Sequence, residues 1–171
     1  MTDNDRKFKK EALDWLLQSA DSYTHAVTLT LKPYRIVLTE NGQMREVLTR
    51  YEATRNFSYF LRRLNASLFG NSPKRYGKSI SVLPMLEGEA NQKLLHYHCA
   101  LGNFPASLTE DEIQTKIVTA WHQTPFGNVQ TDVQKMHTSG WLTYVAKELG
   151  RKNVDVIDLE NMRQLPAASL T

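Results

Sequence analysis

Alternating apolar and polar side chains predict four strands. Within His25–Lys32, the apolar Val27, Leu29 and Leu31 alternate with Thr28 and Thr30, and Pro33 follows. Two further apolar runs, Ser79–Glu87 and Leu94–Leu101, are separated by a polar connection and together predict a hairpin. A last short alternation over Val129–Val133 predicts the fourth strand of a sheet.

A spacing of three to four residues between apolar side chains predicts helices between these strands. Thr109 and Glu112 have the spacing of a capping box, and Ser139 and Gly150 are suited to begin and end a short helix. Asn41-Gly42 marks a turn before the longest helix. The predicted helices are Arg6–Gln18, Glu46–Phe69, Thr109 to about His122, and Gly140–Leu149.

The order of these elements predicts an α+β fold with a central, mainly antiparallel sheet of about five strands and flanking helices. Pro84 indicates that its strand lies at an edge or carries a bulge, and the tail Asn153–Glu160 is a candidate fifth strand. No repeat or linker divides the chain, so we expect one domain over residues 1–171, with a frayed tail at 161–171.

Composition narrows the possible classes of protein. The 171 residues include 21 Lys and Arg against 18 Asp and Glu, a net charge of +3 that permits a nucleic-acid partner without requiring one. The single cysteine, Cys99, cannot form an internal disulfide, which fits a reducing cytoplasm. Met1–Lys10 is charged, and no apolar run reaches the length of a membrane span, so we expect no signal peptide and no membrane anchor.

His96-Tyr97-His98 lies inside a predicted strand and is the first candidate for chemistry. Residues i and i+2 of a strand point to the same face, so both imidazoles aim at one point. A hairpin folded about Asn91-Gln92 places Glu87 across from His96 and completes a two-histidine, one-carboxylate site for Mn²⁺ or Mg²⁺. Glu89 is the rival ligand if the register slips by two residues. The alternative is a pair of half-buried strand histidines beside a solvated glutamate.

Tyr144 is the second candidate. On the predicted helix Gly140–Leu149 it shares a face with Lys147 and Arg151, three to four residues apart. A tyrosine hydroxyl can act as a nucleophile, and neighbouring cations favour its phenolate. Taken alone, these residues equally describe an exposed tyrosine among surface charges.

Together the segments HAVTLTLK, LLHYHCAL and YVAK resemble the HUH endonucleases, and among them the rolling-circle replication initiators of plasmids and phages that use one catalytic tyrosine. The order and spacing agree from His25 to Arg151. The resemblance implies that His96 and His98 bind a divalent metal ion, with Glu87 as the third ligand.

The same resemblance implies an activity. Tyr144 attacks a phosphodiester of single-stranded DNA at a replication origin, leaving a 5′-phosphotyrosine and a free 3′-hydroxyl, and Lys147 helps to position the metal or the substrate. No nucleotide cofactor is implied. The pattern GKS at Gly77-Lys78-Ser79 lacks the glycine that a phosphate-binding loop needs at position 72, so a partner such as a host helicase has to unwind the DNA, ahead of a host polymerase.

Related branches of the superfamily fit less well. Relaxases carry a third histidine where this chain has Asn103, and single-domain transposases follow the tyrosine with glutamine where Glu148 stands. The transposase nevertheless stays an alternative, as does a noncatalytic nucleic-acid-binding module that would bind through aromatic side chains on its sheet.

Basic side chains suggest where DNA binds. An exposed loop is expected to contact phosphates, with a tyrosine stacking on a base. The candidates are Lys74, Arg75, Tyr76 and Lys78 in this loop, Arg62 and Arg63 on the long helix, and Arg151 and Lys152 beside the tyrosine helix. The alternative is that these are solvated surface charges.

Overall fold

The computed structural model describes residues 6–7, 10–11, 14–15, 18–71, 77–88, 94–137, 140 and 156–163. Its main sheet has the strand order β4-β5-β1-β6, and every neighbouring pair is antiparallel. The predicted α+β class is therefore confirmed. The strands are β1 His25–Leu31, β4 Ser81–Glu87, β5 His96–Gly102 and β6 Gly127–Lys135.

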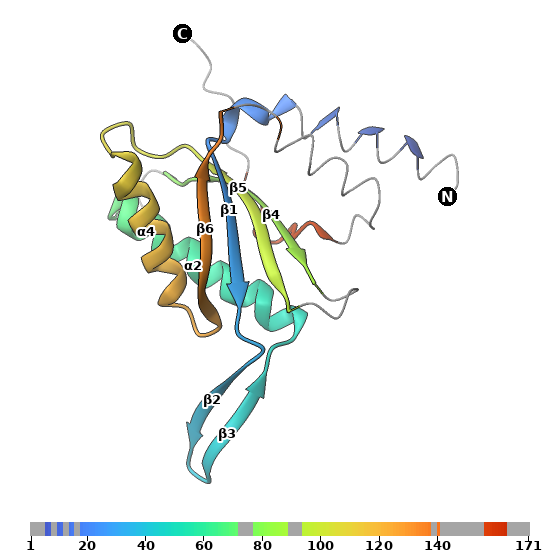
Figure 1. Cartoon of the computed structure of the whole chain (residues 1–171), viewed down its shortest axis with the longest axis vertical. Helices are drawn as coiled ribbons and strands as arrows, with labels where there is room; N and C mark the ends of the chain where they lie inside the picture. The colour runs from blue at the N-terminus through green and yellow to red at the C-terminus, as the bar shows by residue number, and fades with distance from the viewer. Residues whose placement is uncertain are drawn as a thin grey trace.

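Two helices cover one face of this sheet. Figure 1 shows α2 (Arg50–Phe69) crossing behind the four strands and α4 (Glu110–His122) beside β6. We call this side of the sheet the helix face. Alternate strand residues point to it and form the main core with the two helices. Its strand residues include Val27, Leu29 and Leu31 of β1 and Tyr97, Cys99 and Leu101 of β5. The opposite side of the sheet is called the open face.

The hairpin β4–β5 has the predicted register. Glu87 pairs with His96 and Met85 with His98. β4 lies at the edge of the sheet, as Pro84 indicated, because a residue without an N–H is tolerated best at an edge. The capping box of Thr109 and Glu112 is also present at the start of α4.

The region between β1 and α2 differs from the prediction. The helix expected from Glu46 begins only at Arg50, where the Thr49 side chain accepts a hydrogen bond from the Glu52 N–H. The preceding residues form a separate hairpin, β2 (Tyr34–Thr39) and β3 (Gly42–Val47), which extends away from the body of the molecule in Figure 1. Most of its side chains are exposed, so no one-sided pattern marks its strands in the sequence.

The C-terminal part of the described chain lies along the outer edge of β4. It forms isolated bridges from Ile157 to Met85 and from Arg163 to Val82. Of the fifth strand expected over 153–160, residues 153–155 lie outside the described residues, and residues 156–160 form no continuous strand. Asn161, expected to begin a frayed tail, is 2% exposed.

Buried polar groups tie this segment down. The Tyr97 hydroxyl donates to Asp158 Oδ2 at 2.8 Å, and Asn161 Nδ2 donates to the same oxygen at 2.7 Å. Ser58 of α2 donates to Asn161 Oδ1 at 2.6 Å. The segment is therefore anchored both to the strand that carries the histidines and to the helix behind it.

The described residues of the predicted N-terminal helix are helical, namely residues 6, 7, 10, 11, 14, 15 and 18. A short turn of 3₁₀ helix, η1 (Ala20–Ser22), leads from there into β1. Among the helices that the structure describes, none is long and apolar enough to cross a lipid bilayer.

Candidate metal centre

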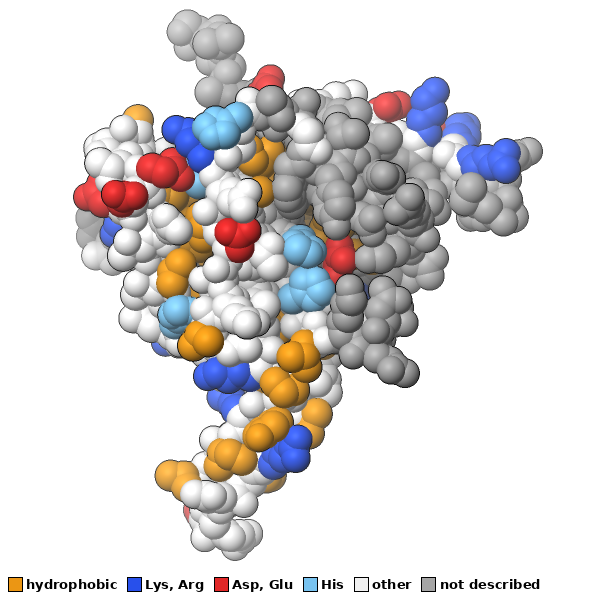
Figure 2. Space-filling model, in the orientation of Figure 1, with side chains coloured by type: hydrophobic (Ala, Val, Ile, Leu, Met, Phe, Trp, Pro, Cys, Tyr) orange, Lys and Arg blue, Asp and Glu red, His pale blue; other side chains and the backbone are white. Residues whose placement is uncertain are grey.

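Glu87, His96 and His98 form a cluster on the open face. One potential ligand atom from each side chain lies within 4.8 Å of those of the other two, and all three residues are half-buried. The two imidazole rings are perpendicular, with centroids 4.9 Å apart. Figure 2 shows pale blue histidine atoms beside red carboxylate atoms near the middle of this face.

The cluster follows from strand geometry. His96 and His98 project to the same side of β5 because they are two residues apart, while Tyr97 and Cys99 between and after them are buried on the helix face. Directly opposite residues of antiparallel strands also share a face, so the pairing of Glu87 with His96 brings the carboxylate to the same side. Glu89, the rival ligand, lies outside the described residues.

Both histidines have one ring nitrogen occupied within the protein. His96 Nδ1 lies 2.9 Å from the Leu94 carbonyl oxygen, and His98 Nδ1 lies 3.0 Å from Thr28 Oγ1. Such partners hold the ring, and with Nδ1 engaged in this way Nε2 is the nitrogen that would bind a metal ion. The donor set thus consists of two imidazole nitrogens and one carboxylate, which could hold a divalent metal ion.

The rest of the open face divides into a polar part and an apolar part. Beside the cluster, β1 contributes Thr28 and Thr30, and β6 contributes Asp132 directly opposite Thr28. Toward the other end of the strands lies a small apolar cluster, which we call the open-face cluster. It contains Tyr23, Leu83, Met85, Ala100 and Ile157, with Ala20, Met136, Val156 and Met162 packed against it.

The predicted nucleophile and most of the predicted DNA contacts lie outside the described residues. They are Tyr144, Lys147, Arg151 and Lys152, together with Lys74, Arg75 and Tyr76. The residues that flank the tyrosine segment are described, however. Met136 precedes it and Val156 follows it, and both pack against the open-face cluster.

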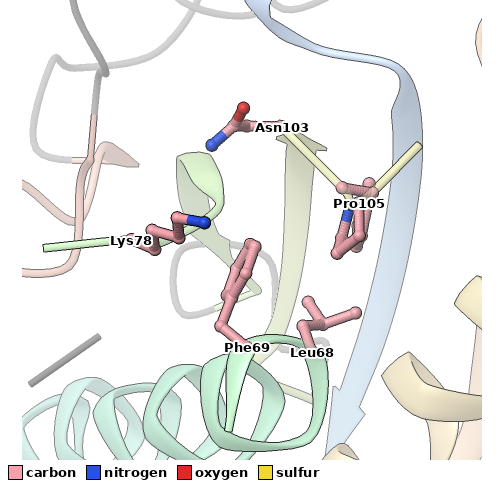
Figure 3. A pocket seen from close by; sticks show the side chains of 6 residues that line it. Leu68, Phe69, Lys78, Asn103 and Pro105 are labelled. Carbon is pink, nitrogen blue, oxygen red and sulfur yellow. The ribbon is translucent and has the colours of Figure 1, made fainter. Parts of the chain in front are cut away.

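Lys78 lies far from the metal cluster. Lys78 comes just before Ser81, the first residue of β4, whereas Glu87 is the last residue of that strand. At about 3.3 Å per residue, the two ends of the strand are about 20 Å apart. Figure 3 shows the Lys78 side chain at a pocket with Phe69 and Asn103. The structure therefore does not join Lys78 to the cluster.

Arg62 and Arg63 are also remote from the cluster. Both are exposed on α2, which covers the helix face. The Arg62 guanidinium lies 4.7 Å from the centroid of the Tyr59 ring, and Arg63 donates to Gln123 Oε1 at 3.3 Å. Their positions do not support a contact with a substrate bound on the open face.

Two further titratable groups on β5 are excluded from the site by burial. Burial, and then the Asp158 carboxylate, raise the pKa of the Tyr97 phenol. Burial raises the pKa of the Cys99 thiol as well. Both groups therefore stay protonated and face the core, so neither serves as a nucleophile or ligand on the open face.

Thr28 and Asp158 were not singled out by the sequence. For Thr28 a signal existed, since it lies on the alternating strand His25–Lys32 among the polar positions. For Asp158 no local pattern connects it to Tyr97, which lies 61 residues away.

Comparison of the chain with protein-family profiles, with curated proteins and with solved structures gives no match.

Proposed function

We propose that the protein is a metal-dependent single-stranded DNA endonuclease that nicks a replication origin through a tyrosine intermediate. The observation that carries this proposal is the cluster of Glu87, His96 and His98 on the open face, with Nδ1 of each histidine held by a partner. It adds a spatial site to the three sequence segments that resemble the HUH endonucleases.

The donor set favours Mn²⁺ over Mg²⁺, because imidazole nitrogens are poorer ligands for Mg²⁺ than oxygens. The three residues would hold a divalent ion, and the chemistry that such an ion supplies is to withdraw charge from a nonbridging phosphate oxygen of the DNA backbone. His96 and His98 would each offer one imidazole nitrogen from β5, and Glu87 a carboxylate oxygen from the neighbouring strand β4. The half-buried setting strengthens these electrostatic interactions relative to bulk water.

The chain path supports Tyr144 as the nucleophile. Met136 and Val156 flank residues 137–155 and pack against the open-face cluster, which includes Met85. Met85 lies directly opposite His98. The described residues on either side of the tyrosine segment therefore lie on the same side of the sheet as the metal cluster, which supports a nucleophile that acts there.

The proposed step transfers a phosphoryl group. The Tyr144 phenolate oxygen forms a bond to phosphorus, and the bond between phosphorus and the 3′ oxygen breaks. The leaving 3′ oxygen takes up a proton to become a hydroxyl, and the 5′ phosphate remains on the tyrosine. Lys147 is proposed to stabilise the phenolate or the developing charge on phosphate. Because the phosphotyrosine keeps a phosphodiester linkage, the strand can be rejoined without a nucleotide cofactor.

The open face argues against a noncatalytic binding module. Modules that bind RNA or DNA on a sheet do so through exposed aromatic rings. Among the described strand residues that share the open face with His96, none is Phe, Tyr or Trp. The residues directly opposite the two histidines there are Thr28, Thr30 and Met85, and Asp132 lies opposite Thr28. This face fits phosphodiester chemistry better than base stacking.

We assign the nicking to the start of rolling-circle replication because of the family resemblance. Unwinding and synthesis are then left to a host helicase and polymerase. A transposase of the same superfamily would share the chemistry and differ in the DNA that it cuts.

The test is formation of a covalent protein–DNA adduct. Labelled single-stranded oligonucleotides covering the DNA around the protein's own gene are incubated with protein and Mn²⁺, then resolved on a denaturing gel. We expect an adduct that disappears in EDTA, in Tyr144→Phe and in His96→Ala.

Tyr51→Phe is the matched control, because Tyr51 is 67% exposed on α2, the helix that covers the opposite side of the sheet, and should leave the adduct unchanged. Tight DNA binding without an adduct in Mn²⁺ would contradict the nuclease and favour the binding module. An adduct that persists in Tyr144→Phe would assign the nucleophile elsewhere. Cleavage at the ends of a mobile element would favour the transposase.

A further inference from the structure

We propose that Thr28 is a positioning residue that holds His98 in the tautomer able to bind a metal ion. Thr28 on β1 lies directly opposite His98 on β5. Its Oγ1 is 3.0 Å from His98 Nδ1. This inference rests on the metal site of the proposed function and adds a residue that is not a ligand.

The chemistry of imidazole gives this contact its direction. A neutral ring carries one N–H, and the nitrogen that binds a metal ion must be free of its proton. For Nε2 of His98 to face the cluster as a ligand, Nδ1 has to carry the proton and donate it to Thr28 Oγ1. The hydroxyl oxygen thereby selects one tautomer and also fixes the rotation of the ring.

His96 achieves the same result through the backbone. Its Nδ1 lies 2.9 Å from the carbonyl oxygen of Leu94, a group that no side-chain substitution removes. His98 depends instead on a side chain. Thr28 is thus the point at which the orientation of the ligands can be altered without touching a ligand.

Thr30 provides a matched comparison. It lies on the same strand and face as Thr28 and directly opposite His96. Its hydroxyl, however, donates to the Gln130 carbonyl oxygen of β6 at 2.6 Å, and His96 already has Leu94 as a partner. Thr30→Val therefore removes a threonine hydroxyl beside the cluster without removing a partner of a ligand.

The first experiment measures Mn²⁺ affinity by isothermal titration calorimetry at one pH. We expect Thr28→Val to weaken binding by about 10-fold to 100-fold, the usual cost of losing a hydrogen-bond partner of a metal ligand. Thr28→Ser keeps the hydroxyl, so its Mn²⁺ affinity is expected to lie within about threefold of the wild type. Thr30→Val removes no partner of a ligand and is expected to stay within the same range.

The second experiment needs no metal ion. Long-range ¹H–¹⁵N spectra of the metal-free protein report which nitrogen of His98 carries the proton. We expect the Nδ1–H form in the wild type and in Thr28→Ser, and a shift toward the Nε2–H form in Thr28→Val. If Thr28→Val does not fold, Thr28→Ala serves as the hydroxyl deletion in both experiments.

Wild-type affinity in the deletion variant, or the Nε2–H form already in the wild type, would overturn the assignment of Thr28. Equal weakening in Thr30→Val would overturn it too, by showing a general effect of the polar face. If the wild type does not bind Mn²⁺, the proposed metal site itself is wrong. If the wild type binds Mn²⁺ but forms no DNA adduct, the nuclease proposal fails while the role assigned to Thr28 stands.

Discussion

Glu87 lies directly opposite His96 across the β4–β5 hairpin. This pairing joins the two halves of the candidate metal centre, because the carboxylate and the imidazoles come from different strands. A shift of the register by one residue would turn Glu87 to the helix face, where α2 and α4 pack. The connection between the two strands therefore decides whether the site has a third ligand.

The three cluster residues are expected to bind Mn²⁺ together. His96→Ala, His98→Ala and Glu87→Ala should each reduce Mn²⁺ affinity by at least about tenfold, since loss of a ligand costs no less than loss of a ligand's partner. Calorimetric titration measures this change. His122→Ala is the control, because His122 is exposed at the end of α4. Three variants that bind like the wild type would show that the cluster is structural.

Tyr97→Phe is expected to destabilise the fold by about 1–3 kcal/mol, because Asp158 loses a buried hydrogen-bond donor. Urea denaturation measures the loss. Tyr59→Phe serves as the control, since the Tyr59 hydroxyl accepts only an exposed hydrogen bond from Arg55 and should change stability by less than about 0.5 kcal/mol. Equal losses in the two variants would contradict an anchoring role for Tyr97.

Burial of Cys99 predicts a loss of stability at alkaline pH. Burial raises the pKa of this thiol in the folded state, whereas the unfolded thiol loses its proton near its ordinary value of about 8.5. The stabilising effect is complete below that pH and declines as the pH rises above it, by up to about 1.4 kcal/mol per pH unit. Urea denaturation at several pH values between 7.5 and 10 measures the free energy of unfolding. Its decline with rising pH should be shallower by this amount in Cys99→Ala than in the wild type. Parallel curves for both proteins would disprove the effect.

Glu110 is expected to stabilise the start of β1 through His25. His25 is 2% exposed, and its Nε2 lies 2.7 Å from Glu110 Oε1. Glu110→Ala should cost about 1–3 kcal/mol by leaving the buried ring nitrogen without this partner, and Glu110→Gln should recover most of it. Thermal and urea denaturation test this, with Asp111→Ala as the control, because Asp111 is exposed in the same helical turn. A control variant that loses as much would point to the helix terminus instead.

The position of Arg62 and Arg63 predicts that they are not DNA contacts. Both lie on the helix that covers the face opposite the metal cluster. The double variant Arg62→Ala/Arg63→Ala should leave single-stranded DNA affinity within about threefold and keep its dependence on salt. Lys74→Ala/Arg75→Ala is expected to weaken binding and to flatten the salt dependence by one to two contacts. Fluorescence anisotropy at several salt concentrations compares the DNA affinities of the two double variants. A larger loss in Arg62→Ala/Arg63→Ala than in Lys74→Ala/Arg75→Ala would indicate that DNA binds on the helix side of the sheet.

Local patterns in the sequence were enough to predict much of the candidate site. The period of two in a strand puts His96 and His98 on one face, and the symmetry of the hairpin puts Glu87 opposite His96, as found. The capping box of Thr109 and Glu112 marks the start of α4 correctly. These features depend on contacts between residues that are close in the chain, so the order of side chains determines them.

Tertiary structure alone decided the rest. Thr28 meets His98 only because β1 pairs with β5, a contact between residues 70 positions apart. Tyr97 and Asp158 meet because the C-terminal segment docks along β4, and Lys78 is separated from the cluster by the length of that strand. The hairpin β2–β3 has exposed residues on both faces and so lacks a one-sided pattern. Local periodicity specifies which face a side chain takes, whereas the packing of distant segments specifies which side chain it meets there.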